Sequence, residues 1–85
     1  MVNSYCRVCG LEQYDEPPWN ETGGPSFNIC SCCGAEFGFH DRYITGVRIT
    51  RKEWLDSGAQ WFRPEEKPTN WNLEEQLNNI PPEWV

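Results

Sequence analysis

Two cysteine-rich stretches set the architecture of this chain: Cys6-Arg7-Val8-Cys9-Gly10 and Cys30-Ser31-Cys32-Cys33-Gly34. Each contains a C-x-x-C-G knuckle, a tight turn in which two thiolates can reach the same metal ion. The glycine after each pair can adopt the positive φ that closes such a turn. We call residues 6–10 the first knuckle and residues 30–34 the second knuckle. Together they predict a tetrahedral site for one structural Zn2+, with four thiolate ligands: Cys6, Cys9, Cys30 and Cys33.

The second knuckle leaves a choice of ligand, because Cys32 and Cys33 are neighbours. Cys33 repeats the spacing of the first knuckle, whereas Cys32 would form a C-x-C pair with Cys30, so the spacing favours Cys33. The remaining thiol of Cys32 could be a redox sensor if a nearby metal lowers its pKa, or it could pack as a small apolar side chain. Iron is the alternative to zinc, since a tetrahedral all-thiolate site accepts either metal.

A closed site of four cysteines has no open position for water or substrate, which predicts a structural role for the metal. The other candidate for chemistry is the neighbouring pair His40 and Asp41, as a catalytic pair or a fifth ligand. A single histidine beside an acid is more often a locally hydrogen-bonded pair, and catalysis would need an oriented partner and a pocket. We therefore expect a protein that is not an enzyme.

Length and charge narrow the class of protein. A chain of 85 residues predicts one domain over residues 1–85, with a zinc-knuckle unit at 1–40 and a helical extension at 41–85. Cores of this size often need a metal or disulfides. Seven Lys and Arg residues against thirteen Asp and Glu give a formal charge of -6, which opposes binding to phosphate backbones.

The number of cysteines and the lack of long apolar segments indicate the cellular compartment in which the protein is expected. Five cysteines are an odd number, which fits a closed disulfide framework poorly and fits metal binding well. No apolar leader precedes the first knuckle, and no segment approaches the length of a membrane span. We expect a cytoplasmic protein without a membrane partner.

Periodicity predicts the remaining elements. Alternation of Ala35, Phe37 and Phe39 with polar residues indicates a short strand after the second knuckle. The predicted fold class is small α+β: a zinc-ribbon-like knuckle unit with two to four short strands, covered by one or two C-terminal helices.

Two helices are expected in the second half of the chain. Thr50 and Glu53 have the spacing of a capping box, which predicts a helix over 51–63 that ends before Pro64. Its expected apolar face contains Trp54, Leu55, Gly58, Ala59, Trp61 and Phe62. Asn72 is the expected N-cap of a second helix over 73–79, and Trp84 is expected to pack back onto the fold.

Four segments of the first forty residues carry a family resemblance: Cys6–Leu11, Asp15–Trp19, Ser26–Gly34 and Glu36–Phe39. They resemble the cysteine-rich CPCC domain family of small bacterial proteins, and residues 54–62 and 70–77 look like a helical extension carried by one branch of that family. The resemblance implies metal-binding cysteines at the four positions given above, and no particular activity. Arg7 and Ser31 stand where the motif has proline, a difference that concerns the rigidity of the turns.

The leading functional hypothesis is a non-enzymatic, acidic protein-binding module, such as an adaptor or a toxin-immunity protein, with a basic partner. Candidate contact residues lie in connectors or at the chain end: Glu65 and Glu66, with Trp19, Trp71 and Trp84 if these tryptophans face outward rather than pack in the core as most of the aromatic residues are expected to do. The alternatives are a redox sensor through Cys32 and a nucleic-acid-associated zinc ribbon. The second alternative would use the main local basic cluster: Arg42, Arg48, Arg51 and Lys52.

Overall fold

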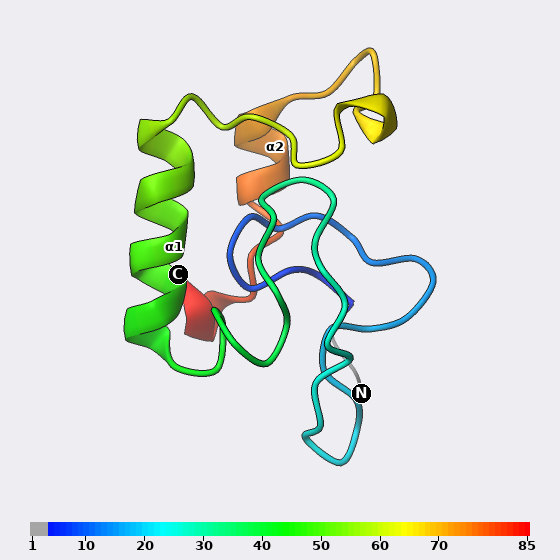
Figure 1. Ribbon diagram of the computed structural model, residues 1–85, viewed down its shortest axis with the longest axis vertical. Coiled ribbons are helices and arrows are strands. Elements are labelled where there is room, and N and C mark those ends of the chain that lie inside the picture. The colour runs from blue at the N-terminus through cyan, green and yellow to red at the C-terminus, as the bar shows by residue number, and fades with distance from the viewer. Residues whose placement is uncertain (1–3) are drawn as a thin grey trace.

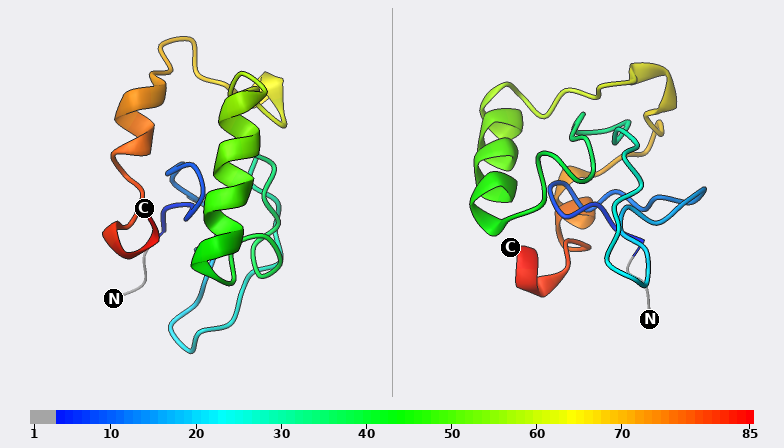
Figure 2. Two further views of the ribbon diagram at one scale, coloured as in Figure 1. Left: turned by 90° about the vertical axis from the view of Figure 1, so that its left-hand side faces the viewer. Right: turned by 60° about the horizontal axis from the view of Figure 1, so that its bottom comes forward.

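The computed structural model describes residues 4–85; residues 1–3, at the start of the expected knuckle unit, lie outside the described residues. The helical elements follow in the order α1 (Ile44–Asp56), η1 (Pro64–Glu66), α2 (Leu73–Leu77) and η2 (Pro82–Trp84), where η denotes a 3-10 turn. The two knuckles and their loops fill the middle of the molecule, and α1 runs along one side (Figure 1). In the left-hand view of Figure 2 the first knuckle lies between α1 and α2.

The expected strands are reduced to single bridges. Within residues 4–85 the β-structure consists of three isolated antiparallel pairs: Tyr5 with Glu12, Trp19 with Pro25, and Ile29 with Glu36. The predicted strand at 35–39 is wrong beyond Phe37, because the chain turns at Gly38, where φ is 99°, and Phe39 is 72% exposed. The small two-helix fold is therefore as expected, but its knuckle unit consists of turns rather than of ribbon strands.

Helix α1 begins seven residues before the start of the predicted range 51–63, and it ends at Asp56, before the end of that range. Its N-cap is Tyr43, which makes no side-chain capping bond, and Thr50 lies inside the helix, so the predicted capping box is wrong. The helix contains many β-branched residues, which have weak helix propensity. Packing overrides this propensity, because Val47 and Trp54 are buried against the knuckles.

The end of α1 is determined by Gly58 rather than by Pro64. Gly58 has a φ of 97°, and its N–H donates to the carbonyl of Leu55 while the N–H of Ala59 donates to the carbonyl of Trp54. These two bonds form a Schellman motif, which satisfies the last carbonyls of the helix. The chain leaves the helix here, so the expected apolar face does not form: Leu55 is 37% exposed and Phe62 is 53% exposed.

Helix α2 confirms the predicted N-cap. The side-chain oxygen of Asn72 accepts a hydrogen bond of 3.0 Å from the N–H of Glu75, and the helix covers Leu73–Leu77, two residues shorter than expected. Beyond it, Trp84 packs against the core, as expected. Within the part of the chain that is described, no helix is both long and apolar enough to cross a membrane.

The cysteines are part of the hydrophobic core. Cys6, Cys9, Cys30 and Cys32 are fully buried, together with Val8, Phe37 and Val47. Trp54, Ala59 and Trp61 complete the same cluster from α1 and the segment that follows it. Any group bound by the cysteines would therefore lie inside the core, where it would influence the stability of the whole fold.

Candidate metal centre

The two knuckles have the same backbone geometry. In the first, the N–H of Gly10 donates to the carbonyl of Cys6 at 3.0 Å; in the second, the N–H of Gly34 donates to the carbonyl of Cys30 at 2.9 Å. Both glycines have positive φ, 85° and 79°, as the sequence predicts. This conformation disfavours other side chains, so the glycines hold each cysteine pair on a tight turn.

The knuckles bring four thiols together. The Sγ atoms of Cys6, Cys9, Cys30 and Cys33 all lie within 4.8 Å of one another. Cys6 and Cys33 are separated by 3.7 Å and Cys9 and Cys30 by 3.6 Å, far beyond the length of a disulfide bond. A tetrahedron with metal–sulfur bonds of about 2.3 Å has edges of about 3.8 Å. The observed spacings thus fit a tetrahedral metal ion bound by the four predicted residues.

Hydrogen bonds around the thiols favour negative charge on sulfur. The N–H of Val8 donates to Cys6 Sγ at 3.4 Å, and the Gln13 side chain donates to Cys30 Sγ at 3.6 Å. Burial raises the pKa of Cys9, whereas the hydrogen bond from Cys33 lowers the pKa of Cys30. A metal ion that binds here would displace the remaining thiol protons.

Helix α2 encloses the site from one side through Gln76, which is 8% exposed. Its side-chain N–H groups donate to the carbonyl of Cys9 at 3.2 Å and to Cys32 Sγ at 3.3 Å, and its oxygen accepts from the indole of Trp71 at 2.7 Å. A Cβ atom at Gly10 would overlap the backbone carbonyl of Gln76. Gln76 thus connects both knuckles to α2.

Helix α1 holds the first knuckle through Arg51. Its guanidinium donates to the carbonyls of Val8 at 2.6 Å, Arg7 at 2.8 Å and Trp84 at 2.8 Å. Burial lowers the pKa of Arg51, and the nearby Cys6 opposes that shift. One side chain therefore fixes the first knuckle, α1 and the chain end, and places a positive charge near the thiols.

Arg7, the residue in place of the motif's proline, organises a second cluster. Its guanidinium lies between the rings of Trp19 and Trp84, 4.1 Å and 3.9 Å from their centroids, and donates to the carbonyl of Asp41. The fully buried carboxylate of Asp41 accepts from the indole of Trp19 at 2.9 Å and from the N–H of Gly38 at 2.7 Å. Trp19 and Trp84 are thus packed, half-buried side chains.

Trp71 is likewise committed to the fold. Besides its hydrogen bond to Gln76, its ring meets that of Trp61 edge-on, with centroids 5.7 Å apart. Trp19, Trp71 and Trp84 are therefore half-buried side chains that pack within the fold, the alternative to the outward-facing placement considered from the sequence. The large side chains that are well exposed include Tyr14, Phe27, Phe39 and Tyr43.

The other candidate residues take structural places. Cys32 is fully buried and lies outside the four-thiol cluster, with its sulfur accepting from Gln76. His40 Nδ1 accepts from the N–H of Glu36 at 2.9 Å, whereas Asp41 binds Trp19 and Gly38. Since the two side chains have different partners, they do not form the catalytic pair considered from the sequence.

Sequence reasoning missed Gln76 and the role of Arg51. Both contact the knuckles across more than forty residues of chain, and Gln76 lies 67 residues from Cys9. A polar residue on the inner face of a short helix, three residues after the apolar Leu73, is a weak local signal for such a contact.

Two curated proteins of Bacillus subtilis strain 168 are similar to this chain. The uncharacterized protein YozI is 28% identical over 79 residues, covering 74% of this chain and 65% of its own length. The uncharacterized protein YoaQ is 31% identical over 78 residues, covering 74% of this chain and 66% of its own length. The chain thus spans just under two thirds of each relative.

No family model matches the chain, and no solved structure matches it. The resemblance to the CPCC family therefore stays a prediction from the quoted residues.

Proposed function

We propose that this chain is a zinc-stabilised, non-enzymatic module that binds a basic protein in the cytoplasm, as an adaptor or a toxin-immunity protein does. The observation that carries the proposal is the four-thiol cluster, in which Cys6, Cys9 and Cys30 have no exposed surface and Cys33 is half-buried. A metal bound by four thiolates has no open position for substrate, so it stabilises the fold. Zinc is the metal proposed, since its tetrahedral thiolate sites are the common form of such knuckles.

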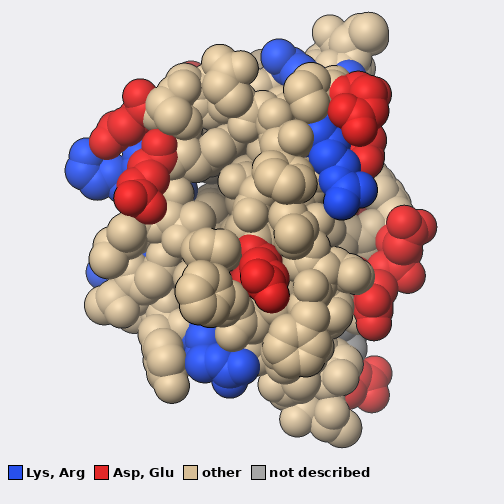
Figure 3. Space-filling view, viewed as in Figure 1, with Lys and Arg blue, Asp and Glu red and all other residues tan. Residues whose placement is uncertain are grey.

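The surface charge supports a basic partner. Acidic side chains follow the right-hand edge of the molecule in Figure 3, whereas Lys and Arg are scattered over the same face. Glu65 and Glu66 are exposed in η1. A net charge of -6 attracts a basic protein over long distances and accelerates its association. The five cysteines form no disulfide in the described residues, which suits a reducing compartment.

The alternative functions have less support. Of the basic cluster, Arg51 binds three carbonyls of the fold, and the exposed Lys52 pairs with Asp56 at 2.7 Å. The exposed Arg48 and Arg42 donate to the carbonyls of Val85 and Gly38. With one member committed to the fold and another paired with an acid, little of a basic stripe remains for a nucleic acid. A redox sensor needs an accessible thiol, and Cys32 is fully buried.

The test is affinity capture from a native lysate with mass spectrometry, with the metal-depleted protein as the control. We expect a basic protein that binds the zinc-loaded form only. Association with that purified partner should slow when Glu65→Lys is combined with Glu66→Lys, and it should lose part of its salt dependence. If repeated capture finds no partner while a zinc-dependent catalytic activity persists through purification to homogeneity, the proposal is wrong.

A further inference from the structure

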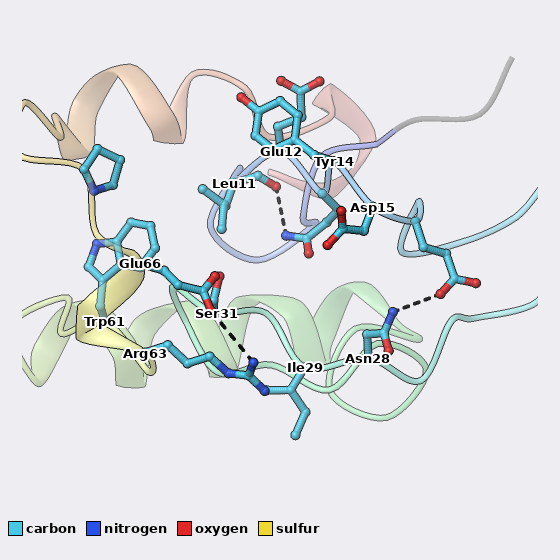
Figure 4. A pocket seen from close by; sticks show the side chains of 13 residues that line it. Leu11, Glu12, Tyr14, Asp15, Asn28, Ile29, Ser31, Trp61, Arg63 and Glu66 are labelled. Carbon is cyan, nitrogen blue, oxygen red and sulfur yellow. Dashed lines mark hydrogen bonds and ion pairs between the residues drawn. The ribbon is translucent and has the colours of Figure 1, made fainter.

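A groove of about 510 Å3 lies between the two knuckle hairpins, outside the thiol cluster. Figure 4 shows Leu11, Glu12, Tyr14 and Asp15 along one wall and Ile29, Ser31 and Arg63 along the opposite wall, with Trp61 at one end. We call it the interknuckle groove. Its volume suits part of an extended peptide, and it offers apolar surface from Leu11, Ile29, Trp61 and Pro68.

The groove is strongly acidic. Among the described residues, four carboxylates line it, Glu12, Asp15, Glu16 and Glu66, against the single guanidinium of Arg63. Arg63 lies 3.8 Å from Glu66, so within this described lining the other three carboxylates have no cation beside them. The charge of Glu12 also raises the pKa of the exposed Tyr14 hydroxyl, which agrees with a negative potential along this wall.

Both walls present backbone edges that can bind an added strand. On the first wall, the bonds of Cys6 to Leu11 and of Gln13 to Ser4 flank Glu12, so the N–H and C=O of Glu12 point away from their own hairpin. Ile29 has the same position between the bonds Cys30 to Ala35 and Phe37 to Asn28. Among the described residues, the backbone groups of Glu12 and Ile29 make no hydrogen bond.

We propose that the interknuckle groove binds an extended segment of a basic protein. A Lys or Arg side chain of that segment lies between Asp15, which has no cation beside it among the described lining residues, and Glu66, which it shares with Arg63. Both carboxylates point into the space between the walls (Figure 4). Its backbone pairs with the free edge at Glu12 or Ile29, in the manner of strand addition. This inference rests on the proposed function and specifies where the basic partner binds.

The test uses the zinc-loaded, 15N-labelled chain and a short peptide of alternating lysine and valine, capped at both ends. In an NMR titration we expect saturable shifts at the amides of Glu12, Asp15, Ile29 and Glu66. The matched peptide with glutamate in place of lysine should cause none of them. Asp15→Lys combined with Glu66→Lys should weaken lysine-peptide binding by about tenfold or more, because two like charges replace the attraction.

The control is Glu21→Lys combined with Glu53→Lys, two exposed residues outside the groove that give the same change in net charge. It should weaken peptide binding by less than about threefold, through long-range attraction alone. Equal weakening of peptide binding by both variants would show a general charge effect and would overturn the proposal that the interknuckle groove is the binding site. Shifts that map elsewhere, or that arise from self-association, would overturn it as well.

The groove and the proposed function can fail separately. If a captured partner binds the groove variant, Asp15→Lys combined with Glu66→Lys, as tightly as the unchanged chain, the groove is not its binding site. The proposed function would then remain intact. A partner that loses affinity with the groove variant but not with the control supports both.

Discussion

Cys32 and Cys33 are adjacent residues with the same side chain and different environments. Cys33 belongs to the four-thiol cluster, whereas Cys32 packs beneath Gln76. We expect Cys33→Ala to lose the metal ion and the fold. Cys32→Ala should keep one metal ion per chain and lose about 1 kcal/mol of stability, as for a small buried side chain. Elemental analysis with urea denaturation measures both, and a Cys32→Ala protein without metal would contradict the ligand set.

Gln76 is the residue on which the contact between α2 and the knuckles depends. Gln76→Glu keeps the shape but places a carboxylate oxygen against a carbonyl and a sulfur that both accept hydrogen bonds. A buried group without its bonding partners costs about 1–3 kcal/mol, and more when it is charged. We therefore expect Gln76→Glu to lower the free energy of unfolding of the zinc-loaded protein by roughly 3 kcal/mol.

The matched control is Gln60→Glu, the same chemical change at an exposed side chain. It should change the unfolding free energy by less than about 0.5 kcal/mol. Equal stabilities of the two variants in urea would show that the hydrogen bonds of Gln76 to the knuckles do not stabilise the fold.

These residues show where sequence information is sufficient at this scale. The spacing of each cysteine pair and its glycine is local, so the turns and the gathering of the four thiols follow from the sequence. The contacts of Gln76 and Arg51 depend on how α1 and α2 dock, and Gln76 reaches Cys9 across 67 residues. Trp19 shows the same limit, because it and its partner Asp41 belong to no motif that links them, whereas the paired knuckles are linked by the metal that their spacing predicts.

At the scale of elements, Gly58 decides where α1 ends. Its φ of 97° is strained for any residue with a Cβ, so Gly58→Ala should destabilise the protein by about 1 kcal/mol. A glycine inside a helix, as the predicted range 51–63 would require, should instead gain about 1 kcal/mol on the same change. The sign of the stability change in urea denaturation therefore distinguishes the two structures.

Gly58→Asn is the control for this prediction, because asparagine tolerates positive φ better than alanine. We expect stability to fall in the order Gly, Asn, Ala. Added side chains meet little there, since a Cβ atom would lie 3.3 Å from the flexible end of Gln60, so the order reports backbone strain. If the Gly58→Ala protein is the most stable of the three proteins, α1 does not end in a Schellman motif at Gly58.

The two helices also show why the start of α2 was predicted correctly and the bounds of α1 were not. Asn72 caps α2 by a hydrogen bond to Glu75, only three residues further along the chain, so this helix start can be predicted from the sequence. Helix α1 has no side-chain cap and many β-branched residues, and it exists because Val47, Arg51 and Trp54 dock on the knuckles. Thr50 and Glu53 have the pattern of a cap only by coincidence of spacing.

At the scale of the whole molecule, the core is built around the thiols. Helix α1 has 13 residues and α2 has 5, both near or below the length at which isolated helices are stable. Their docking residues, Arg51 and Gln76, bind the backbone of the knuckles themselves. A structural zinc ion can contribute roughly 10 kcal/mol, comparable to the stability of an entire small domain.

Metal removal should therefore unfold the chain as a unit. With a strong chelator we expect cooperative loss of the helical circular dichroism together with a red shift of tryptophan emission, since Trp54 and Trp61 leave the same core. One equivalent of Zn2+ should restore both signals, whereas Mg2+ should restore neither, because it prefers oxygen ligands. If elemental analysis finds no metal while the helical signal persists, the packed apolar side chains alone hold the fold, and the metal centre is not its foundation.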